Sequence, residues 1–226
     1  MKITYLGHSS FLVQINQFTL LFDPFISPNP LASKIPLDTL KPDYILVSHG
    51  HYDHIADAVV IAKQSDAKII ASYEIISYLE KQGVKNGHSM NLGGSHLFEF
   101  GKVKCVNAVH SSSLPDGSYG GNPMGFLIES GEGNFYFAGD TALSYDMKLI
   151  GEYKTINFAF LPIGGNYTMD ADNAIIASNF INCDEIIGMH YDTFEVIKIN
   201  HEVCINKFKS AGKKLILPQI GESFDR

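Results

Sequence analysis

The chain has 226 residues, of which 45% are hydrophobic and 18% charged, with a formal net charge of −7 and a pI near 5.7. An acidic chain of this kind is unsuited to broad binding of nucleic acid or of anionic membranes, which needs clustered Lys and Arg. The length suits one sizeable domain, and no low-complexity segment, charge block or Gly/Ser linker divides it. We therefore expect residues 1–226 to form a single domain.

Cys105, Cys183 and Cys204 show no paired or CxxC spacing. A sparse, odd set of cysteines favours a reducing compartment, and each is expected to be a small buried hydrophobic residue. The N-terminus has no long apolar signal segment, and no apolar run approaches the ~18 residues of a membrane span. These features predict a cytoplasmic protein without a membrane span; self-association is left open.

The chain begins with closely spaced apolar segments. Residues 2–6, 11–15 and 18–22 predict three short strands, and their spacing is typical of antiparallel neighbours. His8 lies in the turn between the first two, and Asp23 ends the third. A histidine in a turn is as often solvated as functional, and an aspartate before a proline is common in turns, so composition alone leaves both residues open.

Residues 25–36 hold three prolines and predict a loop that lines a site. An apolar run over 44–47 then predicts a buried strand, and residues 55–65 predict a helix. The seven residues between, 48–54, read Ser-His-Gly-His-Tyr-Asp-His. Side chains at such a strand-to-helix junction leave the core and converge on a cleft.

This junction predicts a metal site. Its imidazole and carboxylate groups are His49, His51, Asp53 and His54. The first two histidines are two residues apart and point the same way in an extended segment, while the other two side chains approach from the turn into the helix. Such a density of these groups suits Zn²⁺, Mn²⁺ or Fe.

The middle of the chain predicts a strand over 67–72 and a helix over 73–82, which together suggest a parallel arrangement with crossovers. His88 and His96 lie among small polar residues and are interpreted as surface histidines. Short strands follow, and the strand over 103–109 ends in His110. The next segment, Ser111 to Pro123, is rich in Ser, Gly and Pro and predicts a flexible loop over a cleft.

The next strand pair, residues 125–130 and 134–138, ends in Gly139-Asp140-Thr141. A glycine before the aspartate lets the carboxylate enter a crowded site with little steric interference. A strand over 158–162 leads to a Gly-rich segment over 164–169, which lacks a nucleotide-binding spacing and is expected to form a wall of the site.

The last third predicts a helix over 172–180, a strand over 185–189 that ends in His190, a helix over 200–211 and a strand over 214–217. His201, at the start of the last helix, is interpreted as a surface residue. His190 instead repeats the position of the earlier candidates, directly after an apolar strand.

His-x-His-x-Asp-His after a strand resembles the signature of the metallo-β-lactamase superfamily, and Gly-Asp-Thr at 139–141 resembles a later part of it. The match covers nearly the whole chain, and Gly-His-Ser at 7–9 is similar to the ascorbate-phosphate-lactonase-like branch. The fold class implied by the resemblance is α/β, a four-layer αββα sandwich with the site at one sheet edge.

The resemblance implies two divalent metal ions, Zn or Mn, with Fe as a further option. It assigns one metal to His49, His51 and His110. It assigns the other to Asp53, His54 and His190, with Asp140 shared between both. Asp23 resembles a residue outside the ligand set that hydrogen-bonds to a metal-binding imidazole, a contact that fixes the tautomer. The Gly-His-Ser match also favours a place near the site for His8.

The function implied is a metal-dependent hydrolase that uses a metal-bridging hydroxide on a small ester, lactone or phosphodiester. Asp53 and Asp140 are the expected catalytic carboxylates, and Asp53 would orient the water or carry its proton. No Gly-x-Ser-x-Gly motif is present, which argues against a serine hydrolase. The alternatives are an RNase-type nucleic-acid processing enzyme of the same fold and a metal-dependent oxidoreductase.

Overall fold

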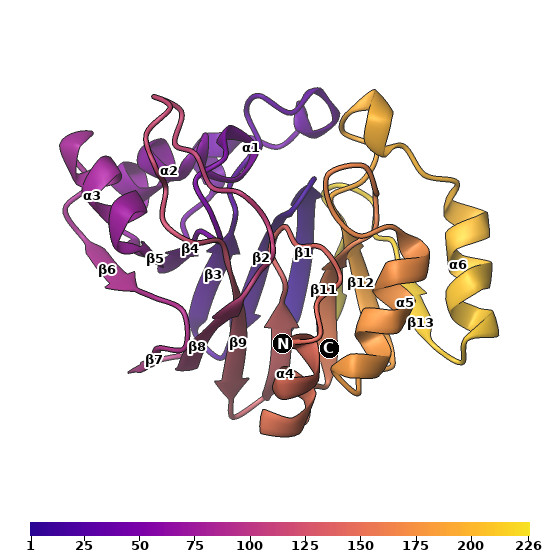
Figure 1. Cartoon of the computed structure of the whole chain (residues 1–226). Helices are drawn as coiled ribbons and strands as arrows, with labels where there is room; N and C mark the ends of the chain where they lie inside the picture. Colours follow the sequence, from indigo (N-terminus) through magenta and orange to yellow (C-terminus); the bar gives the residue numbers. More distant parts are fainter.

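The short apolar segments of the chain pair into two seven-stranded sheets that pack face to face. The computed structural model describes residues 1–226, and helices cover the outer face of each sheet (Figure 1). These four layers confirm the predicted αββα sandwich. No helix is long and apolar enough to cross a membrane.

The first sheet is built by the N-terminal part of the chain and one strand from the end. Its order is β14-β1-β2-β3-β4-β5-β6. The pairs from β14 to β3 are antiparallel and those from β3 to β6 are parallel. The spacing of the segments predicts the antiparallel pairs among β1, β2 and β3 and the parallel pair of β4 and β5, whereas β6 and β14 are not predicted. The strands are β1 (Lys2–Gly7), β2 (Ser10–Ile15), β3 (Phe18–Phe22), β4 (Tyr44–Leu46), β5 (Lys68–Ser72), β6 (Gly87–Met90) and β14 (Ser223–Asp225).

The second sheet has the order β13-β12-β11-β10-β9-β8-β7. Its pairs from β7 to β10 are antiparallel and those from β10 to β13 are parallel. The strands are β7 (Ser95–Phe98), β8 (Gly101–Asn107), β9 (Met124–Ser130), β10 (Gly133–Phe137), β11 (Phe158–Pro162), β12 (Glu185–Met189) and β13 (Lys214–Ile216).

Three helices lie on each side. Those packed on the first sheet are α1 (Tyr52–Ile55), α2 (Ala58–Ser65) and α3 (Tyr73–Lys81), and those beside the second are α4 (Met147–Tyr153), α5 (Ala171–Phe180) and α6 (His201–Ser210). Single 3₁₀ turns span Pro30–Ala32, Leu37–Thr39 and Glu195–Ile197. The side chains of Ser72, Asp170 and Asn200 cap α3, α5 and α6 by accepting a backbone N–H of the first turn.

The core lies between the two sheets and is largely aromatic. Phe22 of β3 stacks on Phe137 of β10 with ring centroids 4.6 Å apart, and Phe11 of β2 meets Phe160 of β11 at 4.7 Å. All four side chains are fully buried. Such cross-sheet pairs hold the strands in a fixed position, because burial and ring contact both favour it.

One predicted helix needs correction. The helix expected over 55–65 is two helices, since the chain breaks at Asp57, whose carboxylate accepts the backbone N–H groups of Ile26 and Ser27. The predicted loop from Ser111 to Pro123 has no helix or strand, and within it Leu114 is buried and Ser113 pairs with Tyr119 in an isolated antiparallel bridge; its flexibility stays a prediction.

Candidate metal centre

The candidate ligands meet at one end of the sandwich, the upper end in Figure 1, because they follow the carboxyl ends of strands that run in the same direction. Sharp turns deliver three of the surrounding residues. His8, Asp23 and His190 have φ values of 56°, 42° and 56°, a left-handed conformation that is uncommon outside glycine. The backbone N–H of His190 donates to the carbonyl of His8 and so joins the two sheets at this end.

One group consists of three imidazoles, His49, His51 and His110, with candidate ligand atoms all within 4.8 Å of one another. His49 Nε2 lies 3.0 Å from His51 Nδ1. The two rings lie together, although the chain bends at His49 instead of running extended as the spacing predicts. His110 arrives from the other sheet, after β8. Ser111 Oγ lies 3.3 Å from His51 Nε2.

A second group contains Asp53, His54, His190 and His8. Asp53 Oδ2 lies 3.1 Å from His8 Nε2, 3.8 Å from His190 Nε2 and 3.9 Å from His54 Nε2. The structure therefore places His8 beside the other candidates. Its second ring nitrogen, Nδ1, lies 3.0 Å from Thr193 Oγ1, which holds the ring in position.

Asp140 lies between the two groups. Its Oδ2 atom is 2.9 Å from His190 Nε2, 3.3 Å from His54 Nε2 and 3.6 Å from His110 Nε2. The carboxylate is almost completely buried. One oxygen of Asp140 thus faces imidazoles of both groups, which is the placement expected for a shared ligand.

Asp23 supports the site from below the ligands. Its Oδ2 atom is 2.7 Å from His54 Nδ1 and accepts the Ser48 hydroxyl at 2.6 Å, while Oδ1 accepts the Ser48 backbone N–H at 2.7 Å. The Ser48 hydroxyl in turn lies 3.0 Å from His49 Nδ1. Asp23 therefore directs the Nε2 atom of His54 toward Asp140, the geometry expected of a carboxylate that orients a ligand.

The donor set fits a divalent cation. His54 Nε2 and Asp140 Oδ1 are buried and have no hydrogen-bond partner. A buried polar atom is costly to leave unpaired, so unpaired ligand atoms on two residues of the same cluster are what a cation site provides. Imidazole nitrogens and carboxylate oxygens together suit Zn²⁺, Mn²⁺ or Fe²⁺.

Burial sets the protonation of most of these imidazoles. It lowers the pKa of His49, His51 and His110, so these rings are predominantly neutral at pH 7. Burial, together with the neighbouring His190, lowers the pKa of His8 to about 4. Neutral imidazole is the form that binds metals.

His54 behaves differently. Burial disfavours its cation, but the carboxylates of Asp140, Asp23 and Asp53 raise its pKa well above the usual value. For Asp140, burial alone would raise the pKa, because it disfavours the charged carboxylate. His190 and His54 outweigh this effect and hold the pKa of Asp140 well below its usual range. Before metal binds, a proton on His54 therefore balances part of the carboxylate charge.

The remaining histidines lie outside the site. His201 pairs with Asp192 at 2.6 Å and is half exposed, in agreement with its interpretation as a surface residue. His96 is exposed, whereas His88 is partly buried; their ring centroids are 4.4 Å apart.

A cavity of about 780 Å³ opens beside the candidate ligands. The segments expected to line the site do contribute to it: Phe25 and Pro28 from the proline-rich loop, and Tyr167 from the Gly-rich loop. Sequence reasoning missed Tyr52 and Phe194, because an aromatic residue beside a motif or in a short loop gives no periodic signal. From the Ser111–Pro123 loop only Ser111 contributes to the lining.

Known proteins share the fold and much of the sequence of this chain. Residues 19–191 match the family model of the Beta-lactamase superfamily domain. A UPF0173 metal-dependent hydrolase from Flavobacterium johnsoniae is 55% identical over 225 residues, which covers both chains completely. Igni18, a metallo hydrolase from Ignicoccus hospitalis, has a solved structure with a TM-score of 0.89 and 34% identity, covering 100% of this chain and 98% of its own.

A more distant likeness concerns the fold alone. Isothiocyanate hydrolase from Delia radicum gut bacteria superposes with a TM-score of 0.83 at 18% identity, covering 100% of this chain and 99% of that one. The close relatives and the family match, together with the clustered histidines and carboxylates, identify the chain. It belongs to the metallo-β-lactamase superfamily and is a metal-dependent hydrolase.

Proposed function

We propose that the chain binds two divalent metal ions, Zn or Mn, and hydrolyses a small ester, lactone or phosphodiester. The observation that supports this most directly is the position of Asp140, whose Oδ2 atom lies within 3.6 Å of ring nitrogens from both histidine groups. Two clusters joined by one carboxylate, beside an open cavity, suit a binuclear hydrolytic site.

Different residues of the chain would bind each metal and orient the attacking water. His49, His51 and His110 would hold one metal, and Asp53, His54 and His190 the other, while Asp140 would link them. When bound, the metals would supply a water that loses a proton near neutral pH and positive charge for the developing oxyanion. Asp53 is partly exposed to the cavity, so its carboxylate would orient the attacking water and accept its proton.

His8 would position Asp53. Its Nε2 atom lies 3.1 Å from the Asp53 carboxylate while Thr193 holds its Nδ1 atom. Asp23 would do the same for His54 through their 2.7 Å contact. These pairs leave the carboxylate and the imidazole little freedom to turn away from the site, which is how positioned groups lower the entropic part of a barrier.

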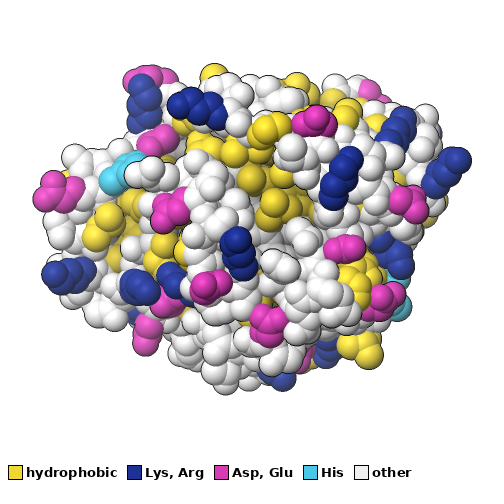
Figure 2. All heavy atoms as spheres, turned by 180° about the vertical axis from the view of Figure 1, so that it is seen from behind, with side chains coloured by type: hydrophobic (Ala, Val, Ile, Leu, Met, Phe, Trp, Pro, Cys, Tyr) yellow, Lys and Arg dark blue, Asp and Glu magenta, His cyan; other side chains and the backbone are white.

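The surface favours a small-molecule substrate over nucleic acid. The net charge is −7, and on the face shown in Figure 2 the Lys and Arg side chains are interspersed with Asp, Glu and uncharged residues and form no continuous stripe. A nucleic-acid groove needs a continuous basic stripe instead. Three unpaired, buried cysteines fit the proposed reducing, cytoplasmic location.

The test combines metal analysis with a substrate panel. Protein purified without chelator should contain close to two transition-metal ions per chain by mass spectrometry, and should hydrolyse at least one ester, lactone or phosphodiester. A saturated content of one metal would contradict the binuclear site. Oxygen consumption in an iron-loaded sample without any hydrolysis would favour the oxidoreductase alternative.

A further inference from the structure

The cavity beside the metal site has an aromatic rim, which we define as Phe25, Tyr52, Tyr167 and Phe194. Three of these rings form one continuous cluster. Phe25 lies 6.0 Å from Tyr52 in an edge-to-face arrangement and 6.4 Å from Phe194, measured between ring centroids. Tyr167 reaches the same cavity from the loop between β11 and α5.

The outer rings of this rim are unusually accessible. Tyr52 and Tyr167 are each 57% exposed and Phe194 is 39% exposed. A single exposed aromatic residue is ordinary, but several around one concave site mark a binding surface, because each leaves a large apolar area in water. The rim of this cavity is therefore matched to an apolar group of a ligand.

The aromatic rim is held in place from behind. The His8 ring lies with its centroid 5.5 Å from both Phe25 and Phe194, in edge-on contact with each. The contact between His8 Nδ1 and Thr193 Oγ1 fixes the loop immediately before Phe194. The same histidine that faces Asp53 thus also supports the rim, which couples substrate position to the hydrolytic site.

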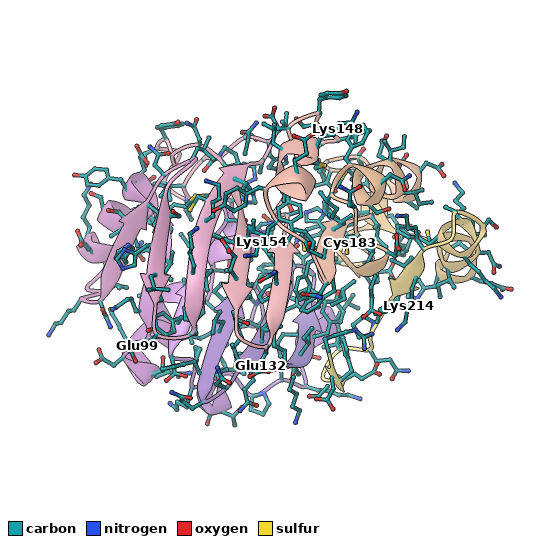
Figure 3. The ribbon with its side chains drawn as sticks, turned by 90° about the horizontal axis from the view of Figure 1, so that it is seen from below. Glu99, Glu132, Lys148, Lys154, Cys183 and Lys214 are labelled. Carbon is teal, nitrogen blue, oxygen red and sulfur yellow. The ribbon has the colours of Figure 1, made fainter.

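No cation lines the cavity. Its charged or titratable groups are two carboxylates, Asp53 and Asp140, and three imidazoles, and none of the 17 Lys and Arg residues contributes. Lys198, near Phe194 in sequence, pairs with Glu195 instead. Lys154 and Lys214 lie at the opposite end of the strands (Figure 3).

This lack of cations limits the substrate. Sites that recognise a phosphate or carboxylate use Arg forks or Lys ammonium groups, and an anion placed against aromatic rings loses hydration without gaining a partner. Only the metal site itself offers positive charge, and the reacting carbonyl would occupy it. A substrate with a further anionic group has nothing to bind that group.

We infer that the substrate is an uncharged carboxylic ester or lactone that carries an aromatic or flat apolar group, with the aromatic rim as its specificity-determining surface. This inference rests on the proposed hydrolytic function and narrows it to substrates without a further anionic group. A phosphodiester carries its single charge on the reacting phosphoryl group, which would lie at the metals, so the substrate comparison below decides between that class and the uncharged esters and lactones. Water adds to the carbonyl carbon and the bond to the ester oxygen breaks. One proton of the water passes to that oxygen, which becomes a hydroxyl group, and the other leaves the new carboxylic acid for the solvent, which gives a carboxylate.

The test uses the metal-loaded full chain and four substrates. Dihydrocoumarin is an uncharged aromatic lactone, its ring-carboxylated derivative adds one negative charge, γ-butyrolactone lacks the ring, and bis(4-nitrophenyl) phosphate is an anionic diester. We expect kcat/KM for dihydrocoumarin to exceed that for each of the others by roughly 10-fold or more, the range that one apolar contact region provides.

Variants connect this preference to the rim. Phe194→Ala and Tyr167→Ala should each lower kcat/KM for dihydrocoumarin by about 10-fold, mainly through KM, because they remove uniform binding. Their effect on γ-butyrolactone should be much smaller. Tyr73→Ala removes a tyrosine that is 67% exposed on α3 and does not line the cavity, so it should match the parent protein.

Calorimetry with phenylacetamide and its 4-carboxy derivative adds a readout independent of turnover. The uncharged amide should bind the metal-loaded protein more tightly, and Phe194→Ala should weaken it about 10-fold. Equal kcat/KM for the charged and the uncharged lactone would overturn the inference. So would a higher kcat/KM for the phosphodiester that the rim variants leave unchanged. Either result would still agree with the proposed hydrolytic function. Absence of any hydrolysis would contradict the proposed function. Calorimetry would then test by itself whether the aromatic rim binds an apolar group. If phenylacetamide bound no more tightly than acetamide, that role of the rim would be wrong.

Discussion

Asp140 provides the sharpest single-residue test of the site, because one of its oxygens faces His54, His110 and His190 at once. Asp140→Ala should lower the content of both metals and abolish hydrolysis, since the positive charges would then repel each other without a carboxylate between them. Metal content by mass spectrometry beside turnover measures both effects. His201→Ala, which removes a histidine outside the site, should change neither. Two retained metals with near-normal turnover in Asp140→Ala would refute the shared role.

Protonation of His54 gives a pH-linked prediction. Its pKa is raised by Asp140, Asp23 and Asp53, so the metal-free protein should carry a proton on this ring at pH 7. His49 is neutral at that pH, because its pKa is lowered. Metal must displace the His54 proton, so binding should release about one proton from this ring. Calorimetry in buffers of different ionisation enthalpy measures the release.

Asp23→Asn is the matched variant for that experiment. It keeps the shape of the side chain but removes a charge 2.7 Å from His54, so the pKa of His54 should fall and less proton should be released at pH 7. Metal affinity should also drop by about 10–100-fold, the usual cost of losing a group that orients a ligand. A heat of binding that is the same in all buffers for both proteins would contradict the assignment of the proton.

The end of β10 depends on a glycine. Gly139 has φ +61°, and a Cβ atom there would lie 2.8 Å from Ser48 Cβ, at the residue that holds Asp23. Gly139→Ala should therefore destabilise the fold by at least about 1–2 kcal/mol for the left-handed backbone alone and should also weaken metal binding. Chemical denaturation and metal titration measure the two effects. In Gly131→Ala, a Cβ atom meets nothing within 4 Å, so this control should be close to neutral.

The sequence predicts those elements whose signal is local and strong. β4 before the His-x-His-x-Asp-His segment and the ends of β10 and β12 are apolar runs, and the histidines and aspartates after them stand out by contrast. β8 alternates Lys with apolar residues, so the signal before His110 is weaker. Elements stabilised by their neighbours are harder to predict. β6 reads Gly-His-Ser-Met and β14 reads Ser-Phe-Asp, and neither has an apolar alternation; they exist through pairing with β5 and β1.

The same distinction holds for helices and for the site. The helix α4 has no side-chain cap, and only Met147 and Ile150 are buried, so its sequence gives a weak signal. The break at Asp57 depends on backbone N–H groups at residues 26 and 27, which are distant in sequence. The contact between His8 and Asp53 likewise joins two separate turns. The sequence predicts individual site residues, but the residues that contact them can be identified only from the structure.

The metal site links the two sheets, since four proposed ligands follow β4 in one sheet and three follow β8, β10 and β12 in the other. Bound metal should therefore stabilise the whole molecule, and chelation should lower Tm. The stabilisation would be about 2.7 kcal/mol when free metal is at 100 times its Kd. Thermal unfolding with and without chelator tests this. His201→Ala should keep the full response, and a Tm that ignores chelator in the parent protein would contradict the link.

The order of the strands along the chain also affects folding during synthesis. Residues 1–90 supply all of the first sheet except β14, and its apolar inner face, including Phe11 and Phe22, is covered only by strands that lie later in the sequence. At about 5–20 residues per second, the ribosome needs roughly 7–27 seconds to add the remainder. During that interval the apolar inner face of the first sheet has no covering sheet, and one sheet edge is unpaired. We therefore expect the nascent chain to bind chaperones that act near the ribosome exit.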